Sequence, residues 1–219
     1  GSSAIRVALG MGADVTVLDR SVSRLSELDE QYRGQLRTVY STAEAVEERA
    51  READLIIGAV LIPGASAPKL ITAEMLADFK PGTVMVDVAI DQGGCFETSR
   101  PTTHADPTYV VDGVVHYCVA NMPGAVARTA TMALTNATLP YVMRLASERV
   151  ESLLAADKHF AAGLNVANGM LVHPAVDEAL SSHFRQLTPD TRFSGQQMNQ
   201  QPDSQGPETV VHAKVAQLN

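Results

Sequence analysis

Apolar runs and amphipathic segments alternate along the first half of the chain. The runs rich in Val, Ile and Leu predict strands at residues 14–18, 36–40, 54–60, 83–89 and 114–119. Apolar residues at helical spacing lie between these runs and predict helices at residues 2–12, 22–31, 42–52 and 72–79. The run at residues 54–60 is almost wholly apolar, which suits a strand that is covered on both faces. The alternation predicts an α/β fold with a doubly wound parallel sheet.

The pattern changes after Pro123-Gly124, where the β-branched runs end. A stretch rich in Ala, Leu and Met predicts a long helix at residues 125–147, which contains Pro140. We therefore expect a sheet-containing domain at residues 1–124, followed by helices of a second domain at residues 125–180.

The last part of the chain, residues 181–219, has a different composition. It is polar and rich in Gln, with few large apolar side chains to bury. We expect this tail to be largely disordered, above all at residues 186–205. The pair Val210–Val211 is expected to be too short to form ordered structure.

Charge and composition exclude several classes of function. The net charge is −8 and no cluster of Lys and Arg stands out, so we expect no nucleic-acid partner. No apolar run approaches the ~20 residues of a membrane span. Cys95 and Cys118 lack metal-ligand spacing; we expect reduced thiols of a cytoplasmic protein and no metal site, while a disulfide between them stays open. The first residue, Gly1, is not Met, from which we expect a processed, truncated or fragmentary product.

Asp91 is the first candidate for chemistry. It ends the apolar run of V-D-V-A-I-D-Q-G-G, beginning at Val86, and is expected at the carboxyl end of a strand. Ligands of open α/β sheets bind beyond these ends, so a carboxylate there is a candidate for proton transfer. The alternative is that Asp91 only opens the turn at Gly93-Gly94.

Asp19 is the second candidate, because it ends the predicted strand D-V-T-V-L-D. An acidic residue at this place in a dinucleotide-binding fold hydrogen-bonds the adenosine ribose, about 20 residues after a Gly-rich turn. Gly1 lies near the position of the last glycine of that turn. The carboxylate favours NAD over NADP, although Arg20 weakens this inference. The alternative is that Asp19 caps the helix that starts near Ser21.

Two loops at predicted strand ends are further candidates. A-V-L-I-P-G at residues 59–64 either packs against a nucleotide or is a plain Pro-Gly turn. In V-A-N-M-P-G at residues 119–124, the amide of Asn121 can hold a ribose hydroxyl or a carboxamide, or can cap the next helix. His104 and His116 are expected to be structural or surface residues.

Together these segments closely resemble the alanine dehydrogenases, NAD-dependent enzymes that interconvert L-alanine with pyruvate and ammonium. The resemblance covers about residues 1–180 and rests on L-D-R, A-D-L-I-I-G-A-V-L-I-P-G, A-P-K-L-I-T, V-D-V-A-I-D-Q-G-G-C-F-E-T, R-P-T-T-H and V-A-N-M-P-G-A-V-x-R-T-A-T. The related nucleotide-binding subunit of proton-translocating transhydrogenase shares the second and third of these segments but carries other residues at I-D-Q-G-G-C-F-E and N-M-P-G. Asp91 therefore favours the dehydrogenase.

The resemblance implies a Rossmann-like NAD-binding domain, hydride transfer from the alanine Cα to the cofactor, and a homo-oligomer, commonly a hexamer. It implies that Asp91 is the catalytic residue in proton transfer and that Asn121 and Met122 lie at the nicotinamide and substrate end. The cofactor-binding residues that it implies are Gly1, Asp19, Arg24, Ser41, Val60, Leu61, Val88, Asn121 and Met122.

The chain departs from the family at its N-terminal side. The family's N-terminal half supplies a substrate-binding Arg and Lys and a catalytic His, and none of that half is present. The first strand of the nucleotide-binding sheet is missing too, which is expected to leave the inner edges of two apolar strands unpaired. We therefore expect this chain alone to be inactive. The alternative hypotheses are a non-catalytic nucleotide-binding fragment and a transhydrogenase-like NAD(H)-binding subunit.

Overall fold

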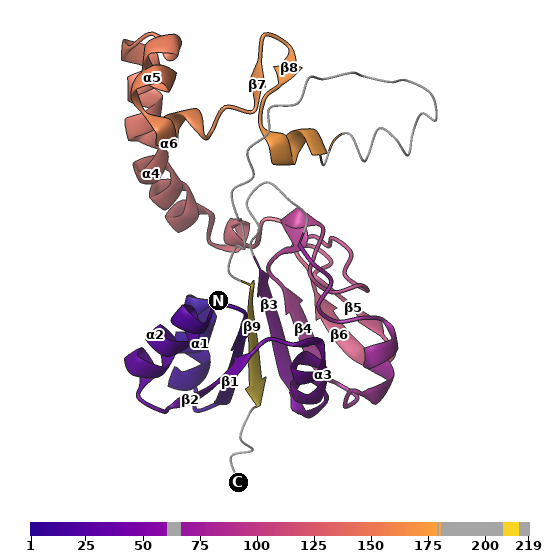
Figure 1. Ribbon diagram of the computed structural model, residues 1–219. Helices are drawn as coiled ribbons and strands as arrows, with labels where there is room; N and C mark the ends of the chain where they lie inside the picture. The colour runs from indigo at the N-terminus through magenta and orange to yellow at the C-terminus, as the bar shows by residue number, and fades with distance from the viewer. Residues whose placement is uncertain (61–66, 179, 181–207, 215–219) are drawn as a thin grey trace. The chain divides into compact units, whose positions relative to one another are not determined.

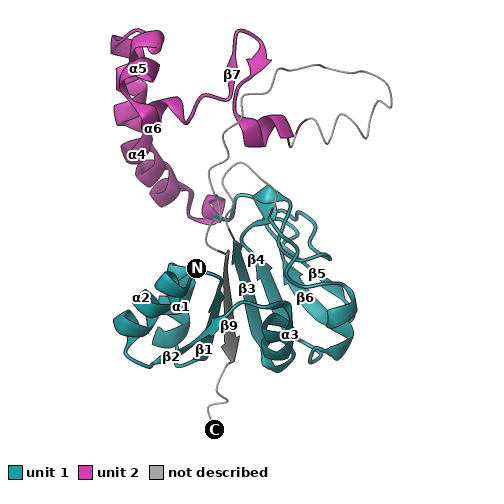
Figure 2. Cartoon of the chain, in the orientation of Figure 1, with its two compact units in different colours: residues 1–122, 203–219 teal, residues 123–202 magenta. Residues whose placement is uncertain are grey.

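A computed structural model describes residues 1–60, 67–178, 180 and 208–214, the last of these as backbone. The chain divides into two compact units (Figure 2). Residues 1–122 and 203–219 form the sheet unit, and residues 123–202 form the helical unit. Each unit is described by itself.

A seven-stranded sheet with the order β2-β1-β9-β3-β4-β6-β5 is the centre of the sheet unit (Figure 1). Five strands are parallel to one another, and β5 and β9 run antiparallel to their neighbours. The α/β class is thus confirmed, with a mixed sheet in place of the wholly parallel sheet that we expected. The bounds are β1 Asp14–Asp19, β2 Leu36–Tyr40, β3 Leu55–Val60, β4 Val84–Asp87, β5 Thr108–Val111, β6 Val114–Tyr117 and β9 Glu208–Lys214.

Three helices cover the two faces of the sheet: α1 (Ser2–Gly10), α2 (Val22–Tyr32) and α3 (Ala43–Glu52). Successive side chains of β1 point to opposite faces. Val15 and Val17 accordingly pack with buried residues of α1 and α2, whereas Leu18 packs in a cluster that includes α3. Helices on both faces make the unit doubly wound.

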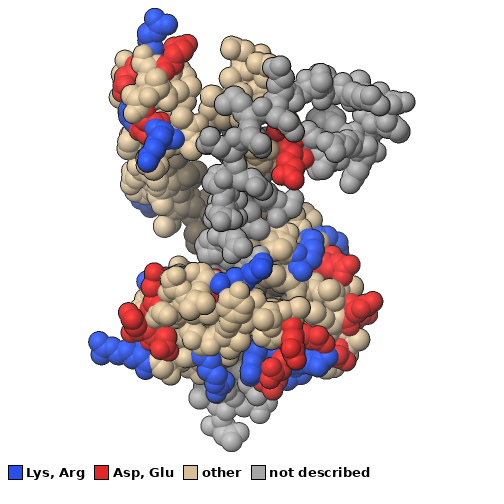
Figure 3. Space-filling view, in the orientation of Figure 1, with Lys and Arg blue, Asp and Glu red and all other residues tan. Residues whose placement is uncertain are grey.

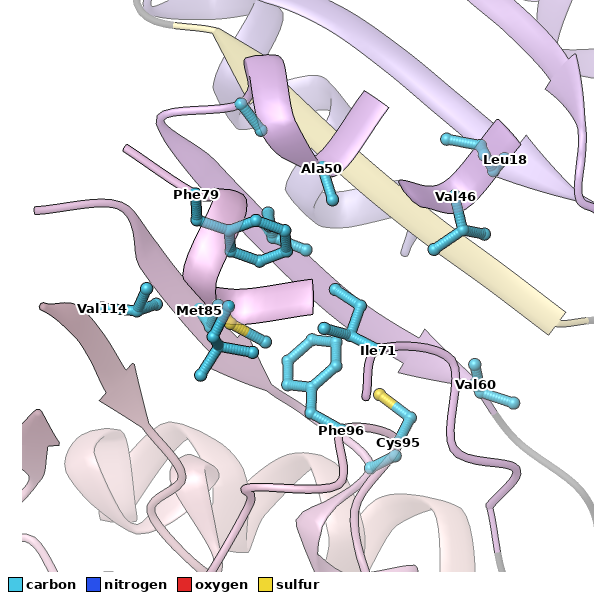
Figure 4. Close-up of a cluster of buried hydrophobic side chains, with 14 of the residues drawn as sticks. Leu18, Val46, Ala50, Val60, Ile71, Phe79, Met85, Cys95, Phe96 and Val114 are labelled. Atoms are coloured by element: carbon cyan, nitrogen blue, oxygen red, sulfur yellow. The ribbon is translucent and has the colours of Figure 1, made fainter. Parts of the chain in front are cut away.

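A larger cluster of buried side chains lies between β3, β4, α3 and residues 67–79 (Figure 4). Phe96 is its largest completely buried side chain. The helix predicted at residues 72–79 is only a short 3₁₀ helix, η1 (Glu74–Asp78). Ile71 forms a bridge with Phe96 that keeps the chain extended up to that point, and Pro81 follows, so little chain is left for a helix.

The hairpin of β5 and β6 was not predicted from the sequence. Its turn is Asp112-Gly113, with φ angles of 49° and 80°. Two central residues with positive φ form the turn that suits a two-residue β-hairpin, and Asp-Gly is one of its preferred sequences. This dipeptide was the signal that could have identified β5.

β9 corrects the prediction for the tail. The segment around Val210–Val211 is a seven-residue strand between β1 and β3, so the inner edges of these strands are paired. A short segment that is unstable alone can become ordered here, because it pairs with two strand edges at once. Residues 186–205, predicted to be disordered, lie outside the described residues.

The helical unit contains the predicted long helix as α4 (Ala127–Ser147), with Pro140 inside it. It is followed by α5 (Val150–Ala156), α6 (Lys158–Ala161), a hairpin of β7 (Val166–Ala167) and β8 (Met170–Leu171), and a helical turn at residues 174–178. Arg144 of α4 donates to Asp157, at the start of α6, at 2.8 Å. Within the described ranges, no helix has the length and apolar character needed to cross a membrane.

Candidate functional site

The predicted cofactor residues of the sheet unit gather at one edge of the sheet. β1, β2, β3, β4 and β6 are parallel, so their carboxyl ends lie at this edge, which we call the carboxyl edge. Two backbone hydrogen bonds connect the segments there. The N–H of Ser41 donates to the carbonyl of Asp19 at 3.1 Å, and the N–H of Val88 donates to Gly58 at 2.8 Å. Val60 ends β3 and is buried, whereas Val88 is half exposed; Leu61 lies outside the described residues.

Asp19 is completely buried at the end of β1. Its Oδ1 accepts a hydrogen bond from the N–H of Ser21 at 2.8 Å. The cap of α2 is Ser21 and not Asp19, because the Ser21 hydroxyl accepts from the N–H of Arg24. The helix-cap alternative for Asp19 is therefore wrong, and the carboxylate instead fixes the turn that leads into α2.

Arg24 brings a positive charge to the start of α1. Its guanidinium donates to Ser2 Oγ at 2.8 Å and also pairs with Glu27. Gly1 directly precedes α1, whose first backbone N–H groups have no partners within the helix. A helix N-terminus with a nearby guanidinium is chemically suited to an anion such as a pyrophosphate.

The position of Asp91 differs from the prediction. β4 ends at Asp87, and Asp91 lies beyond it, exposed, in the short 3₁₀ helix η2 (Ile90–Gln92). The prediction that Asp91 sits at the strand tip was therefore wrong. The chain leaves the sheet early because the Asp87 carboxylate accepts from the N–H of Ala89 at 3.0 Å and turns it.

Asp87 is a buried carboxylate that the sequence reasoning missed. Its Oδ2 accepts from the N–H of Cys95 at 2.9 Å and from the hydroxyl of Ser99, while its Oδ1 accepts from Ala89. The loop from residue 87 to residue 99 is therefore held together by hydrogen bonds to the Asp87 carboxylate. The signal in the sequence was an acidic residue inside an apolar strand, alternating with the buried Met85.

Lys69 and Ala67 also hold the same turn through hydrogen bonds. Lys69 Nζ donates to the carbonyls of Gly93 and Gly94, each at 2.7 Å. The N–H of Ala67 donates to the carbonyl of Gln92 at 3.1 Å. Gln92 Oε1 is buried and has no hydrogen-bond partner within the described part of the chain. Asp87 and Lys69 therefore both hold the turn that contains Asp91. Gln92 Oε1 is a hydrogen-bond acceptor of this turn that no described group uses.

A buried polar cluster lies beside this turn. His116 is completely buried in β6, and its Nδ1 lies 3.1 Å from the carbonyl of Val114, so Nδ1 is the protonated nitrogen. Its Nε2 then accepts from Thr98 Oγ1 at 2.8 Å. Burial lowers the pKa of His116, and the bond to Val114 and the charge of Asp87 offset only part of this effect. One ring nitrogen donates and the other accepts, as a neutral imidazole does, which is consistent with a structural role for His116.

We expect the chain to lose stability as the pH falls below about 6.5, the ordinary pKa of histidine. Since the pKa of His116 is lower in the folded chain, the unfolded chain binds more protons in the window below 6.5. His116→Gln should flatten this part of the profile, measured by urea unfolding between pH 7.5 and 5. His104→Gln, at an exposed histidine, is the control. An unchanged slope in His116→Gln would contradict the assignment.

Asn121 and Met122 follow β6 at the carboxyl edge. Asn121 is exposed and has a left-handed backbone with φ 55°, and its carbonyl oxygen lies 3.0 Å from His104 Nε2. Met122 begins the 3₁₀ helix η3 (Met122–Val126), and the cap position of α4 is Val126. The structure thus joins Asn121 to the loop of His104.

Charges on the sheet unit are mixed in sign. On the face drawn in Figure 3, Lys and Arg are interspersed with Asp and Glu. Arg51, for example, pairs with Asp78 at 2.9 Å. No group of three or more His, Cys, Asp or Glu side chains in the described ranges could hold a metal ion. Cys95 and Cys118 are free and buried, so the disulfide left open by the sequence is not formed.

Comparisons with known proteins agree with this arrangement. Alanine dehydrogenases of Halomonas elongata and Mycolicibacterium smegmatis are 68% and 52% identical over 184 residues, which are 84% of this chain and 50% of each relative. A solved L-alanine dehydrogenase superposes with a TM-score of 0.72 at 49% identity, covering 83% of this chain and 50% of the other. A transhydrogenase from Sinorhizobium meliloti gives 0.50 at 29% identity, with 68% and 40% covered.

The chain spans about half the length of the curated relatives that it matches. A family model described as "Alanine dehydrogenase/PNT, C-terminal domain" matches residues 1–174, which include the sheet unit up to Met122 and most of the described helical unit. The resemblance inferred from the motifs is therefore confirmed, and the chain belongs to the alanine dehydrogenase/PNT family, of which it contains the C-terminal domain.

Proposed function

We propose that this chain is the NAD-binding portion of an alanine dehydrogenase, which converts L-alanine to pyruvate and ammonium reversibly. The observation that carries the proposal is the turn after β4 that contains Asp91. Asp87 and Lys69 hold the backbone of this turn through hydrogen bonds. The buried Asp19 lies at the carboxyl edge of the same sheet. Relatives up to 68% identical are named alanine dehydrogenase, which supports the same activity.

The residues at the carboxyl edge fit a nicotinamide dinucleotide. The Asp19 carboxylate is an acceptor for the hydroxyls of the adenosine ribose and repels a 2′-phosphate, which favours NAD. Arg24 and the start of α1 suit the pyrophosphate. Gln92 Oε1, a buried acceptor without a described partner, suits an N–H donor such as a carboxamide. Val60 and Val88 offer apolar contacts, and Gly1 and Ser41 complete the proposed set.

The proposed chemistry assigns one role to each part of the edge. NAD held by Asp19 and Arg24 would supply the acceptor for the hydride of the alanine Cα. Asp91 is exposed and ionisable, and its carboxylate transfers the proton near the substrate amine. Since Asp87 and Lys69 fix the backbone of its turn, the carboxylate is held without large motion. The Asn121 amide and Met122 contact the nicotinamide and substrate end.

A homo-oligomer and a cytoplasmic location remain part of the proposal. Helix α4 supports the homo-oligomer, because none of its side chains is buried and it exposes large apolar ones such as Leu134 and Tyr141. Large apolar side chains gathered on an exposed helix mark a surface that other protein is expected to cover.

Titration of the purified chain with NADH, followed by nucleotide fluorescence, tests the cofactor site. Asp19→Ala should weaken NADH binding by about 10-fold or more, because hydrogen bonds to a charged group contribute about 1.5–3 kcal/mol each. Asp14→Ala is the matched control, since Asp14 begins the same strand and is exposed. Equal affinity of Asp19→Ala and the unaltered chain would refute the ribose role. Absence of NADH binding by the unaltered chain would refute the site.

Asp91→Asn separates chemistry from binding in the same assay. It should leave NADH affinity unchanged, because its proposed role is proton transfer. In a full-length enzyme that carries this sequence, it should reduce alanine-dependent NADH formation by about 100-fold or more. A full-length Asp91→Asn enzyme with undiminished turnover would refute the catalytic role.

The second candidate is a non-catalytic or transhydrogenase-like NAD(H)-binding module. It is favoured by the match to a transhydrogenase at 29% identity. Alanine-dependent turnover by this chain alone would exclude the non-catalytic module.

A further inference from the structure

The chain around Thr102 runs alongside residues 118–122, which follow β6 and which we call the Asn121 loop. Thr102 forms a parallel bridge with Val119. The N–H of Thr102 donates to the carbonyl of Cys118 at 2.9 Å, and the N–H of Ala120 donates to the carbonyl of Thr102 at 3.1 Å. These bonds continue the pairing beyond the end of β6 and stop one residue before Asn121.

The loop that follows Thr102 is closed on itself. The Thr102 side chain is buried, and its Oγ1 donates to the carbonyl of Pro107 at 2.9 Å. Thr103 Oγ1 accepts from the N–H of Asp106 at 3.3 Å. His104 lies between these contacts and is exposed. Its backbone is therefore held in place, although the residue lies at the surface.

The His104 side chain connects this loop to the Asn121 loop. Its Nε2 lies 3.0 Å from the carbonyl oxygen of Asn121. Since a carbonyl oxygen only accepts hydrogen bonds, Nε2 is the donor. The imidazole thus takes up the Asn121 loop at the residue where the main-chain pairing with Thr102 has ended.

The backbone of Asn121 explains why this contact matters. Its φ of 55° lies in the left-handed region, which few residues other than glycine adopt and in which asparagine is enriched. The direction of its side chain depends on the backbone remaining in this conformation. A donor on the Asn121 carbonyl stabilises the conformation and therefore fixes the position from which the side-chain amide acts.

The Asp91 turn has the same construction. Lys69 Nζ donates to the carbonyls of Gly93 and Gly94, whose φ angles are 86° and 75°. In both loops, a side-chain nitrogen from a separate segment thus holds main-chain carbonyls of residues with positive φ. These loops contain the residues to which the proposed function assigns proton transfer and the nicotinamide end, which points to a positioning role for the donors.

We propose that His104 is a positioning residue for the nicotinamide end of the cofactor. Its Nε2–H holds the Asn121 carbonyl and thereby sets the direction from which the Asn121 amide reaches the nicotinamide half. His104 itself neither touches the cofactor nor transfers a proton. This inference rests on the proposed function, because it concerns a residue of that cofactor site.

Three substitutions at residue 104 separate the hydrogen bond from the rest of the side chain. His104→Ala removes the donor. His104→Gln places an amide N–H near the position of Nε2, whereas the shorter amide of His104→Asn reaches only the position of Nδ1. His104→Gln should therefore behave as the unaltered chain, and His104→Asn as His104→Ala. Because His104 is exposed, all three variants are expected to fold.

Calorimetric titration with two nucleotides tests whether the effect is confined to the nicotinamide end. ADP-ribose contains the adenosine and pyrophosphate of NADH but no nicotinamide. His104→Ala and His104→Asn should weaken NADH binding by about 5-fold, as expected for one lost hydrogen bond, and leave ADP-ribose binding unchanged. Equal weakening of both nucleotides, unchanged NADH binding in His104→Ala, or a failure of His104→Gln to restore it would overturn the positioning role.

The hydrogen bond itself can be measured without a nucleotide. The N–H of Met122 belongs to the same peptide group as the Asn121 carbonyl, so its NMR chemical shift responds to a donor on that oxygen. The shift should change in His104→Ala and return in His104→Gln. An unchanged shift in His104→Ala would refute the inference alone, since NADH binding by the unaltered chain tests the cofactor site separately. Absence of that binding would refute the proposed cofactor site and the positioning role with it.

Discussion

Replacing Asp87 by alanine is expected to lower the free energy of unfolding by about 4 kcal/mol. The carboxylate is completely buried and accepts hydrogen bonds from the N–H groups of Ala89 and Cys95 and from the hydroxyl of Ser99. Alanine leaves these donors in the interior without an acceptor, and each unsatisfied donor costs about 1–3 kcal/mol. Urea unfolding followed by circular dichroism measures the loss.

Two variants make the result specific. Asp87→Asn keeps the shape and one acceptor oxygen but turns an NH₂ group toward donors, so it should lose stability as well, though less than alanine. Asp78→Ala removes an exposed carboxylate that pairs with Arg51 and should change stability by about 0.5 kcal/mol or less. A loss below about 1 kcal/mol in Asp87→Ala would show that the carboxylate does not hold the Asp91 turn.

The parallel part of the sheet could be predicted because its information is local. Runs such as D-V-T-V-L-D and D-L-I-I-G-A-V, with helical periodicity between them, correspond to β1 and β3 almost to the residue. β9 could not be predicted in this way. Its order comes from pairing with two edges that lie far away in sequence, and a composition rich in Gln nearby conceals it.

The residues of the candidate site also fall into those with local signals in the sequence and those whose contacts are distant in the sequence. Asp19 could be proposed as a candidate from the sequence because the end of a strand in a repeating α/β pattern is a local feature. Asp87 was missed because, in the sequence, it reads as an interruption of an apolar strand, and its partners at Cys95 and Ser99 come from the returning chain. Lys69 was missed for the same reason, since it contacts Gly93 and Gly94 across the fold.

Gly58→Ala is expected to cost about 3 kcal/mol or more of stability, because a buried site cannot accommodate the added methyl group. A Cβ at residue 58 would lie 2.2 Å from Cys95 Sγ and 2.7 Å from Phe96 Cζ. Both neighbours are completely buried in the cluster of Figure 4, so neither can move into solvent. A glycine inside a strand often marks such a close approach. Chemical unfolding of the variant measures the loss.

The clash can be separated from any effect on the strand itself. Gly10→Ala adds a methyl group where no atom lies within 4 Å and should be neutral or slightly stabilising. In the Gly58→Ala background, Cys95→Ala removes the nearer obstacle, so the two substitutions together should cost less than the sum of their separate effects. The rescue should stay partial, because Phe96 still blocks the site. Strict additivity would mean that the methyl group does not meet the sulfur, and that the Asp91 turn is not packed directly against β3.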